Sequence, residues 1–161
     1  MATVVFADLV GSTGIFERLG DETAGRFVTQ LTTALSKTFE QHSGRVVKLL
    51  GDGVMLRYPS ASDAVRSVQG LMAEILRAGL PPAHAGITAG PLVIRDGDVY
   101  GHTVNLAARI AGHAGAGELL VAGAVMERLD PAHLGWVDLG DQDLKGLAEP
   151  VRLARITPDQ M

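Results

Sequence analysis

The stretch RVVKLLGDGVMLRY, residues 45–58, has the pattern of a β-hairpin. Runs of branched apolar residues flank Gly-Asp-Gly at 51–53, and glycine and aspartate are typical of tight turns between strands. Apolar residues recur at helical spacing before this hairpin, from Thr23 to His42, and after it, from Ser60 to Ala78. The hairpin is therefore predicted to lie between two amphipathic helices.

A further strand is predicted at each end of this unit. Residues 3–8, which contain the apolar run from Val4 to Ala7, predict a strand, and AHAGITAG at 83–90 is also typical of a strand. The order strand, helix, hairpin, helix, strand predicts a ferredoxin-like βαββαβ fold of the α+β class, in which helices cover one face of an antiparallel sheet. We expect the remaining strand or strands between Gly90 and Tyr100.

The rest of the chain predicts a C-terminal αβ extension of this fold. We expect a short helix from Thr103, a strand at 118–123, a helix at 124–130, and two or three short strands with turns at Gly140 and Gly146. The sequence shows no repeat and no low-complexity linker. All 161 residues are therefore interpreted as one domain.

The composition narrows the classes of function. The chain carries 14 basic and 18 acidic side chains, and the basic ones are scattered, so neither a nucleic-acid surface nor contact with a membrane is predicted. The absence of cysteine excludes disulfides and thiolate chemistry and fits a cytoplasmic location. No apolar run approaches the roughly 20 residues that span a membrane, so we expect a soluble chain. The 5 histidines form no short-range metal-binding motif.

Two aspartates stand where a strand meets a turn that contains glycine. Asp8 ends the apolar run in FADLVGST, and Asp52 lies in the hairpin turn. The first strand and the hairpin are neighbours in the predicted sheet, so the two carboxylates can converge beside a cation. Mg²⁺ typically takes one or two carboxylates together with substrate phosphates. The alternative is that each aspartate only satisfies the backbone of its own turn.

Lys48 emerges from an otherwise apolar strand. By strict alternation it shares a face with Val46 and Leu50. Its stem then either follows the apolar surface or places the ammonium group beside Asp52. A third interpretation is that a lysine donor beside Asp98 as acceptor matches adenine, which offers a ring-nitrogen acceptor and an amino donor. Guanine presents the reverse pattern.

Asn105 and Arg109 lie one helical turn apart in the sequence NLAAR. Their side chains share one face of the predicted helix, while Val104, Ala108 and Ala111 supply its packing side. The pair is either an ordinary polar face or a fork that holds a sugar and a phosphate. In the second case the guanidinium neutralises charge that develops during phosphoryl transfer.

In this order, the segments FADLVGST, VVKLLGDGVML and DVYGHTVNLAAR resemble the catalytic domain of class III nucleotide cyclases, most closely the bacterial single-domain kind. The similarity extends from about Thr3 to Ile156. It implies the ferredoxin-like fold with a C-terminal extension and an adenylate cyclase that converts ATP to 3′,5′-cyclic AMP and pyrophosphate. It also implies a head-to-tail homodimer with active sites shared between the subunits.

The resemblance also implies catalytic and metal-binding roles. Asp8 and Asp52 would hold two Mg²⁺ or Mn²⁺ ions. Asn105 would orient the ribose, and Arg109 would stabilise the transition state. In each active site one subunit would supply the two aspartates, and its partner would supply the base-reading, ribose-binding and transition-state residues together with Lys145 of DLKG.

The substrate contacts implied by the resemblance lie at three places. Lys48 and Asp98 would read the base, and their identities are those of the adenine-selective branch. Lys145 would grip the triphosphate. Backbone amides would contact phosphates along the segment Leu9, Val10, Gly11, Ser12, Thr13, Gly14, Ile15 and Phe16.

Departures from the family pattern leave alternatives open. His102 stands where asparagine is common, and Pro91 stands where many members carry a phosphate-binding arginine, for which Arg45, Arg57 or Arg95 could compensate. One alternative is a catalytically weak or inactive nucleotide-binding or dimerisation module of the same fold. Another is a dinucleotide cyclase of the GGDEF type, but the sequence GDGVM lacks the double glycine and acidic pair of that family.

Overall fold

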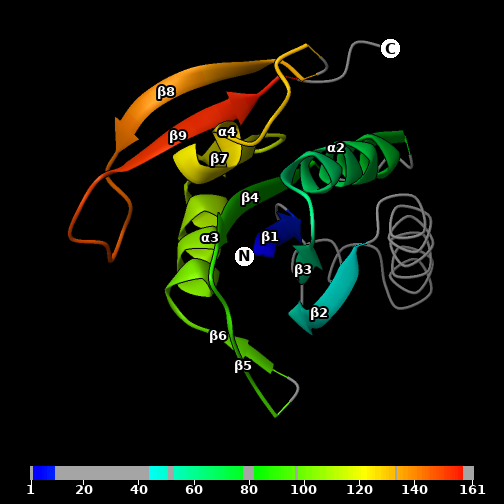
Figure 1. Ribbon diagram of the computed structural model, residues 1–161. Helices are drawn as coiled ribbons and strands as arrows, with labels where there is room; N and C mark the ends of the chain where they lie inside the picture. Colours follow the sequence, from blue (N-terminus) through cyan, green and yellow to red (C-terminus); the bar gives the residue numbers. More distant parts are fainter. Residues whose placement is uncertain are drawn as a thin grey trace, which may run out of the picture.

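The computed structural model describes residues 2–9, 44–50, 53–77, 82–96, 98–132 and 134–157. Within these residues the chain forms a seven-stranded sheet, of strand order β2-β3-β1-β4-β7-β9-β8, and a separate two-stranded sheet (Figure 1). The helix predicted at 23–42 lies outside the described residues. Among the helices that are described, none combines the length and hydropathy needed to cross a bilayer.

The first half of the large sheet is the ferredoxin-like part. It consists of β1 (Ala2–Leu9), β2 (Arg45–Leu50), β3 (Gly53–Tyr58) and β4 (Ala83–Gly90), with helix α2 (Ala61–Arg77) between β3 and β4. Strand β1 lies between β3 and β4 and is antiparallel to both. The predicted α+β, ferredoxin-like fold class is confirmed.

The C-terminal extension adds the other half of the sheet. Helix α3 (His102–His113) leads to β7 (Leu119–Ala122), and the chain continues through α4 (Gly123–Met126), β8 (Trp136–Gln142) and β9 (Val151–Ile156). Strand β7 is parallel to β4, so the sheet is not antiparallel throughout; the α3 crossover makes this pairing possible. Helix α4 is shorter than the helix predicted at 124–130, and β8 continues through Gly140 instead of turning there.

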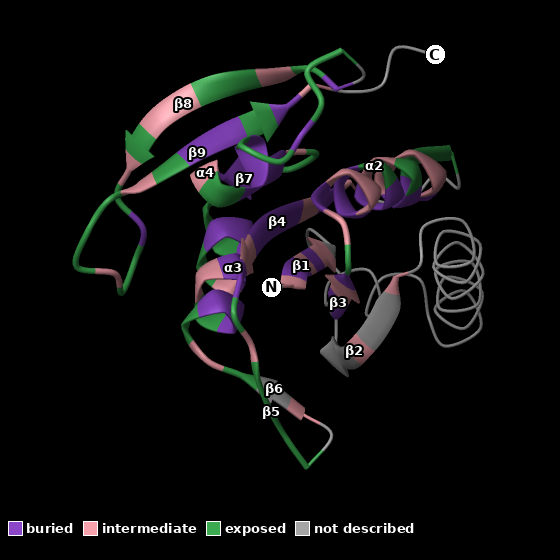
Figure 2. Cartoon of the chain, viewed as in Figure 1, coloured by how far each residue is buried: buried purple, intermediate pink, exposed green. Residues whose placement is uncertain are grey.

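Strands β5 (Val93–Arg95) and β6 (Asp98–Tyr100) form a hairpin of their own. Strands were expected between Gly90 and Tyr100, and both lie there. They stay outside the main sheet because β4 already pairs with β1 on one side and β7 on the other. Figure 1 shows the hairpin extending away from the sheet, beyond α3. Figure 2 shows β5 as exposed along its length.

The core lies on both faces of the large sheet. Val5 and Ala7 of β1 belong to the cluster packed under α2, whereas Val4 packs with Met55 and with Val104 of α3 on the opposite face. This division follows from the two-residue alternation of side chains along a strand. Helix α2 and helix α3 therefore cover opposite faces, so the prediction of helices on one face does not extend to α3.

Candidate active site

Helix α3 lies directly against β4 because two glycines in that strand leave room for it. A Cβ atom on Gly86 would lie 2.3 Å from the backbone nitrogen of Ala111, and one on Gly90 would lie 2.5 Å from Oγ1 of Thr103. Any larger residue would force the helix away from the strand. The helix thus contacts the strand closely at both ends, through the backbone of Ala111 and through the side chain of Thr103.

This packing leaves Asn105 and Arg109 on the exposed side of α3. Val104 and Ala111 are buried beneath the helix, and Ala108 is half-buried, so the packing side is the one expected from the spacing. Asn105 and Arg109 are one turn apart on a helix whose position is fixed. They can therefore address one ligand from the same direction.

The structure places Arg109 beside the loop that carries Lys145. A Cβ atom on Gly146 would lie 3.2 Å from Nη2 of Arg109, so the guanidinium rests against the backbone of Gly146. Lys145 directly precedes Gly146 and is exposed. Arg109, expected at the transition state, and Lys145, expected at the triphosphate, are thus distant in the sequence but lie at neighbouring positions in the fold.

Asp8 is the penultimate residue of β1 and lies between two neighbouring strands. It lies opposite Gly53 of β3 and His84 of β4 and is half-buried. Asp52 lies outside the described residues, but Gly53 directly follows it in the chain. Gly53, the first described residue after the turn, therefore lies beside Asp8 in the sheet, and the position of Asp52 stays a prediction.

His84 connects this strand end to α3. Its Nδ1 lies 2.7 Å from the carbonyl oxygen of Ala111, to which the ring N–H donates. The sequence analysis did not single out His84, because its partner lies on a helix 27 residues further along the chain. Its position in the strand AHAGITAG was the one local signal, and it showed only that His84 lies in a strand.

The proposed base-reading residues lie on different sheets. Lys48 of β2 pairs with Met55, and Asp98 of β6 is half-buried and pairs with Arg95. A register shift lies between Val46 and Lys48, so the pairing of β2 with β3 is not regular along this stretch. The side chain of Lys48 lies outside the description, and its pairing with the base stays a prediction.

The phosphate-binding segment after β1 is described only at its start. The backbone of Leu9 ends β1, and the rest of the predicted segment, residues 10–16, lies outside the described ranges. A cluster of three or more His, Cys, Asp or Glu side chains is not found within the described residues. Mg²⁺ in nucleotide sites typically needs only one or two carboxylates beside the phosphates, so an aspartate pair suits it.

Known proteins are similar to this chain in sequence and in fold. The chain is 34% identical over 160 residues to a protein named pH-sensitive adenylate cyclase from Mycobacterium tuberculosis, and 36% identical over 128 residues to one named adenylate cyclase from Streptomyces coelicolor. These matches cover 96% and 78% of the chain. The solved structure of an adenylate/guanylate cyclase/hydrolase from Silicibacter pomeroyi matches 99% of this chain and 98% of its own, with a TM-score of 0.78 and 26% identity.

The chain has the class III nucleotide cyclase fold. The resemblance stated from the sequence is thereby confirmed. No family model matches the chain. The cyclase fold spans the chain, whereas the chain spans only 40% of the Mycobacterium relative and 33% of the Streptomyces relative.

One departure from the usual cyclase pattern is visible at the surface. Pro91 follows β4 directly and is exposed. Of the arginines considered as replacements, Arg57 is half-buried on β3 and Arg95 is exposed at the end of β5. The side chain of Arg45 lies outside the description.

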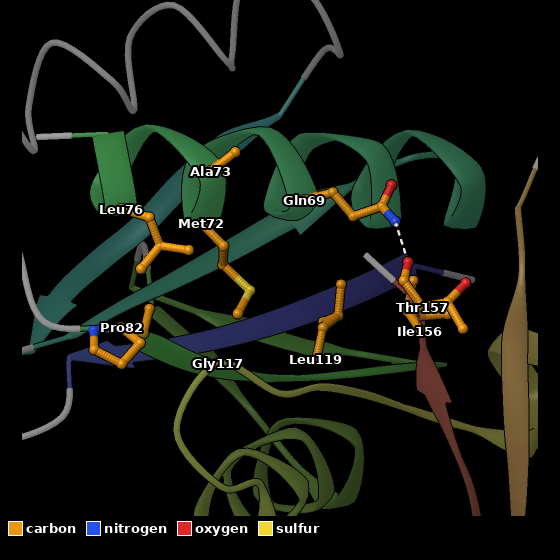
Figure 3. A pocket seen from close by; sticks show the side chains of 10 residues that line it. Gln69, Met72, Ala73, Leu76, Pro82, Gly117, Leu119, Ile156 and Thr157 are labelled. Atoms are coloured by element: carbon orange, nitrogen blue, oxygen red, sulfur yellow. Dashed lines mark hydrogen bonds between the residues drawn. The ribbon is translucent and has the colours of Figure 1, made fainter. Parts of the chain in front are cut away.

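A pocket of about 250 Å³ lies on the α2 side of the cyclase fold, away from α3 (Figure 3). Met72, Pro82 and Leu119 contribute apolar walls, and the amide of Gln69 donates to the carbonyl oxygen of Thr157 at 3.2 Å. The described residues that line this pocket include none of the predicted site residues. It is therefore separate from the candidate active site.

Proposed function

We propose that this chain is the catalytic domain of an adenylate cyclase, which converts ATP to 3′,5′-cyclic AMP and pyrophosphate. The observation that carries the proposal is the contact between Arg109 of α3 and Gly146, next to Lys145, in a cyclase fold. The similarity to relatives named adenylate cyclase supports the choice of product. Absence of cysteine is compatible with a site of action in the cytoplasm.

Asp8 and Asp52 are the proposed ligands of two Mg²⁺ or Mn²⁺ ions. Asp8 is half-buried at the end of β1 and lies opposite the residue that follows Asp52. Carboxylate oxygens are the hard ligands that these cations prefer. Bound ions of this kind lower the pKa of a coordinated hydroxyl group and neutralise phosphate charge.

The remaining groups hold ATP for an in-line displacement. The ribose 3′-oxygen forms a bond to the α-phosphorus and gives its proton to solvent water. The bond between the α-phosphorus and the oxygen that bridges to the β-phosphorus breaks, and pyrophosphate leaves with that oxygen. Asn105 holds the ribose, and Lys145 holds the outer phosphates. Arg109 donates hydrogen bonds to oxygens of the transferring phosphoryl group, where a guanidinium stays charged and can bind two oxygens at once.

Lys48 and Asp98 select the base in this proposal. The lysine donates to the adenine ring nitrogen, and the aspartate accepts from the adenine amino group. GTP would place an oxygen acceptor against the aspartate. Selectivity then follows because a buried polar group without a partner is costly.

A head-to-tail homodimer would complete the site, and the β5–β6 hairpin supports a second copy as partner. Val93, Ile94 and Tyr100 are 54%, 61% and 51% exposed on this hairpin. A two-stranded hairpin alone is marginally stable in water, and clustered exposed apolar side chains mark interaction surfaces. Two-fold symmetry would give each dimer two equivalent sites.

The absence of an arginine at Pro91 favours the second candidate, a catalytically weak or inactive nucleotide-binding module. Incubating the purified chain with ATP and Mn²⁺ and separating the products by chromatography distinguishes the two. An adenylate cyclase should form cyclic AMP and pyrophosphate in equal amounts. Formation of both products should stop when the metal is chelated. Binding of ATP without either product would show the inactive module instead.

A further inference from the structure

We propose that Gly146 is a positioning residue for Arg109, and that the turn from Leu144 to Leu147 is a platform on which the guanidinium is held before substrate arrives. The inference rests on the proposed function, because it takes Arg109 as the group that contacts the phosphate. It adds a role for Gly146 that the sequence analysis did not assign.

The platform is a hydrogen-bonded β-turn. The backbone N–H of Leu147 donates to the carbonyl oxygen of Leu144 at 3.1 Å, which makes Lys145 and Gly146 the two central residues. Gly146 has φ of +84°. The third residue of a type II turn has φ of about +80°, a value that favours glycine.

The turn is anchored to the same core as α3. Leu144 is 3% exposed and packs in a cluster with Ile110 and Leu153, and Leu147 packs against this cluster. Ile110 directly follows Arg109 in the helix. The two central residues of the turn stay exposed. The helix that carries Arg109 and the turn beneath its side chain are therefore fixed to each other by shared apolar packing.

The guanidinium lies face-on against Gly146. A Cβ atom there would be 3.2 Å from Nη2, 3.3 Å from Cζ and 3.4 Å from Nε of Arg109. A point in the plane of the group cannot be so far from all three bonded atoms at nearly equal distances, so the position lies above the plane. The N–H groups of arginine point outward within that plane. Contact through the face therefore leaves the donors directed at a ligand.

Such a contact restricts the side chain before substrate binds. Arginine has many rotamers, and fixing one in advance lowers the entropy lost when a ligand is held. A methyl group at position 146 would push the guanidinium off its position by a few tenths of an ångström and would strain the turn. Small displacements of groups that position a reaction lower its rate steeply.

The chain offers a matched control at Gly140. This glycine also has a positive φ, of +70°, but no described atom lies within 4 Å of the position of its Cβ. Alanine at either position would therefore strain the backbone. Only at position 146 would its methyl group also crowd the guanidinium of Arg109. Thermal unfolding of both variants measures the strain separately from the effect on the reaction.

The kinetic test compares Gly146→Ala with Gly140→Ala in steady-state assays with ATP and Mn²⁺. We expect Gly146→Ala to lower kcat by about 10- to 100-fold with little change in KM, and Gly140→Ala to retain the wild-type kcat. Gly146→Ala should have no further effect in an Arg109→Ala background. Equal kcat values in the two glycine variants, or a full further loss in the Arg109→Ala background, would overturn the inference.

A second measurement does not depend on activity. The Nε–Hε signal of Arg109, assigned with Arg109→Lys, should show restricted motion in the wild-type protein and in Gly140→Ala, and increased motion in Gly146→Ala. An Arg109 signal as mobile as that of exposed Arg66 would overturn the inference even in an active enzyme. A rigid Arg109 in a protein that forms no cyclic AMP would overturn the proposed function while supporting the platform.

Discussion

Asp8 and His84 lie directly opposite each other on β1 and β4, and the ring of His84 is hydrogen-bonded to the end of α3. Side chains opposite each other on antiparallel strands are typically about 4.5–5.5 Å apart at Cβ. Within one copy, His84 therefore lies between the strand end that carries Asp8 and the helix that carries Arg109. The pairing of β1 with β4 sets the positions of Asp8 and His84 relative to each other.

Replacing Arg109 tests the proposed transition-state contact. Arg109→Ala should lower the turnover of ATP by about 10³-fold or more, because arginines that neutralise charge in phosphoryl transfer contribute this much. The measurement is the initial rate of cyclic AMP formation at saturating ATP. Arg66→Ala, which changes an exposed arginine on α2, should leave the rate unchanged. A near wild-type rate in Arg109→Ala would remove Arg109 from the mechanism.

Exchanging the proposed base-reading pair should change the substrate. Lys48→Glu together with Asp98→Cys should favour GTP, since the donor and acceptor at the base would be reversed. Sites that hydrogen-bond their substrate reject an analogue with unmatched groups by up to about 10⁴- to 10⁵-fold in kcat/KM. The ratio of kcat/KM for ATP and GTP measures the change. If the preference for ATP persists, other residues select the base.

The contact between β4 and α3 should make Gly86 one of the least replaceable residues. Gly86→Ala should lower the free energy of unfolding by about 3 kcal/mol, because the new methyl group overlaps backbone atoms of α3. Gly70→Ala is the control: no described atom lies near this exposed helical position, and alanine should stabilise the helix by up to about 1 kcal/mol. Urea unfolding measures both. Similar changes in the two variants would contradict the close packing of α3.

Stability should fall at alkaline pH because of Tyr58. Burial raises the pKa of Tyr58, and Asp63 raises it further, although the hydrogen bond with Ser67 lowers it. The unfolded chain ionises this tyrosine near pH 10 and the folded chain at higher pH, so its contribution to stability is complete below about pH 10 and is lost as the pH rises through the folded pKa.

Unfolding free energies from pH 7 to 11 test this linkage in Tyr58→Phe. The variant should be less stable by about 1 kcal/mol at neutral pH, because its hydrogen bond with Ser67 is lost. Its stability should then decline less steeply than that of the wild type above pH 10. A wild-type slope in Tyr58→Phe would show that Tyr58 does not titrate as inferred.

Local patterns predicted the described parts of the ferredoxin-like unit well. The hairpin around 51–53 and helix α2 depend on turn residues and on apolar spacing within a short stretch, which the sequence shows directly. The exposed positions of Asn105 and Arg109 follow from helical spacing in the same way. The fold could therefore be predicted from segments that each form their own structure.

Features that depend on contacts between distant segments could not be predicted. The bulge near Val47 interrupts an alternation that looks regular in the sequence, because pairing with β3 determines it. Gly86 and Gly146 look like ordinary glycines until α3 and Arg109 are placed beside them. The hairpin after Gly90 lies outside the main sheet because β7, which the chain reaches only after α3, occupies the edge of β4.

Mixing two inactive variants tests the shared site most directly. Asp8→Asn and Arg109→Ala should each form little cyclic AMP alone, since each homodimer lacks one essential group in both sites. An equimolar mixture allowed to exchange subunits should recover about a quarter of the wild-type activity, because half of the dimers are mixed and each has one intact site. A mixture as inactive as its components, although mixed dimers form, would contradict a site built from Asp8 of one copy and Arg109 of the other.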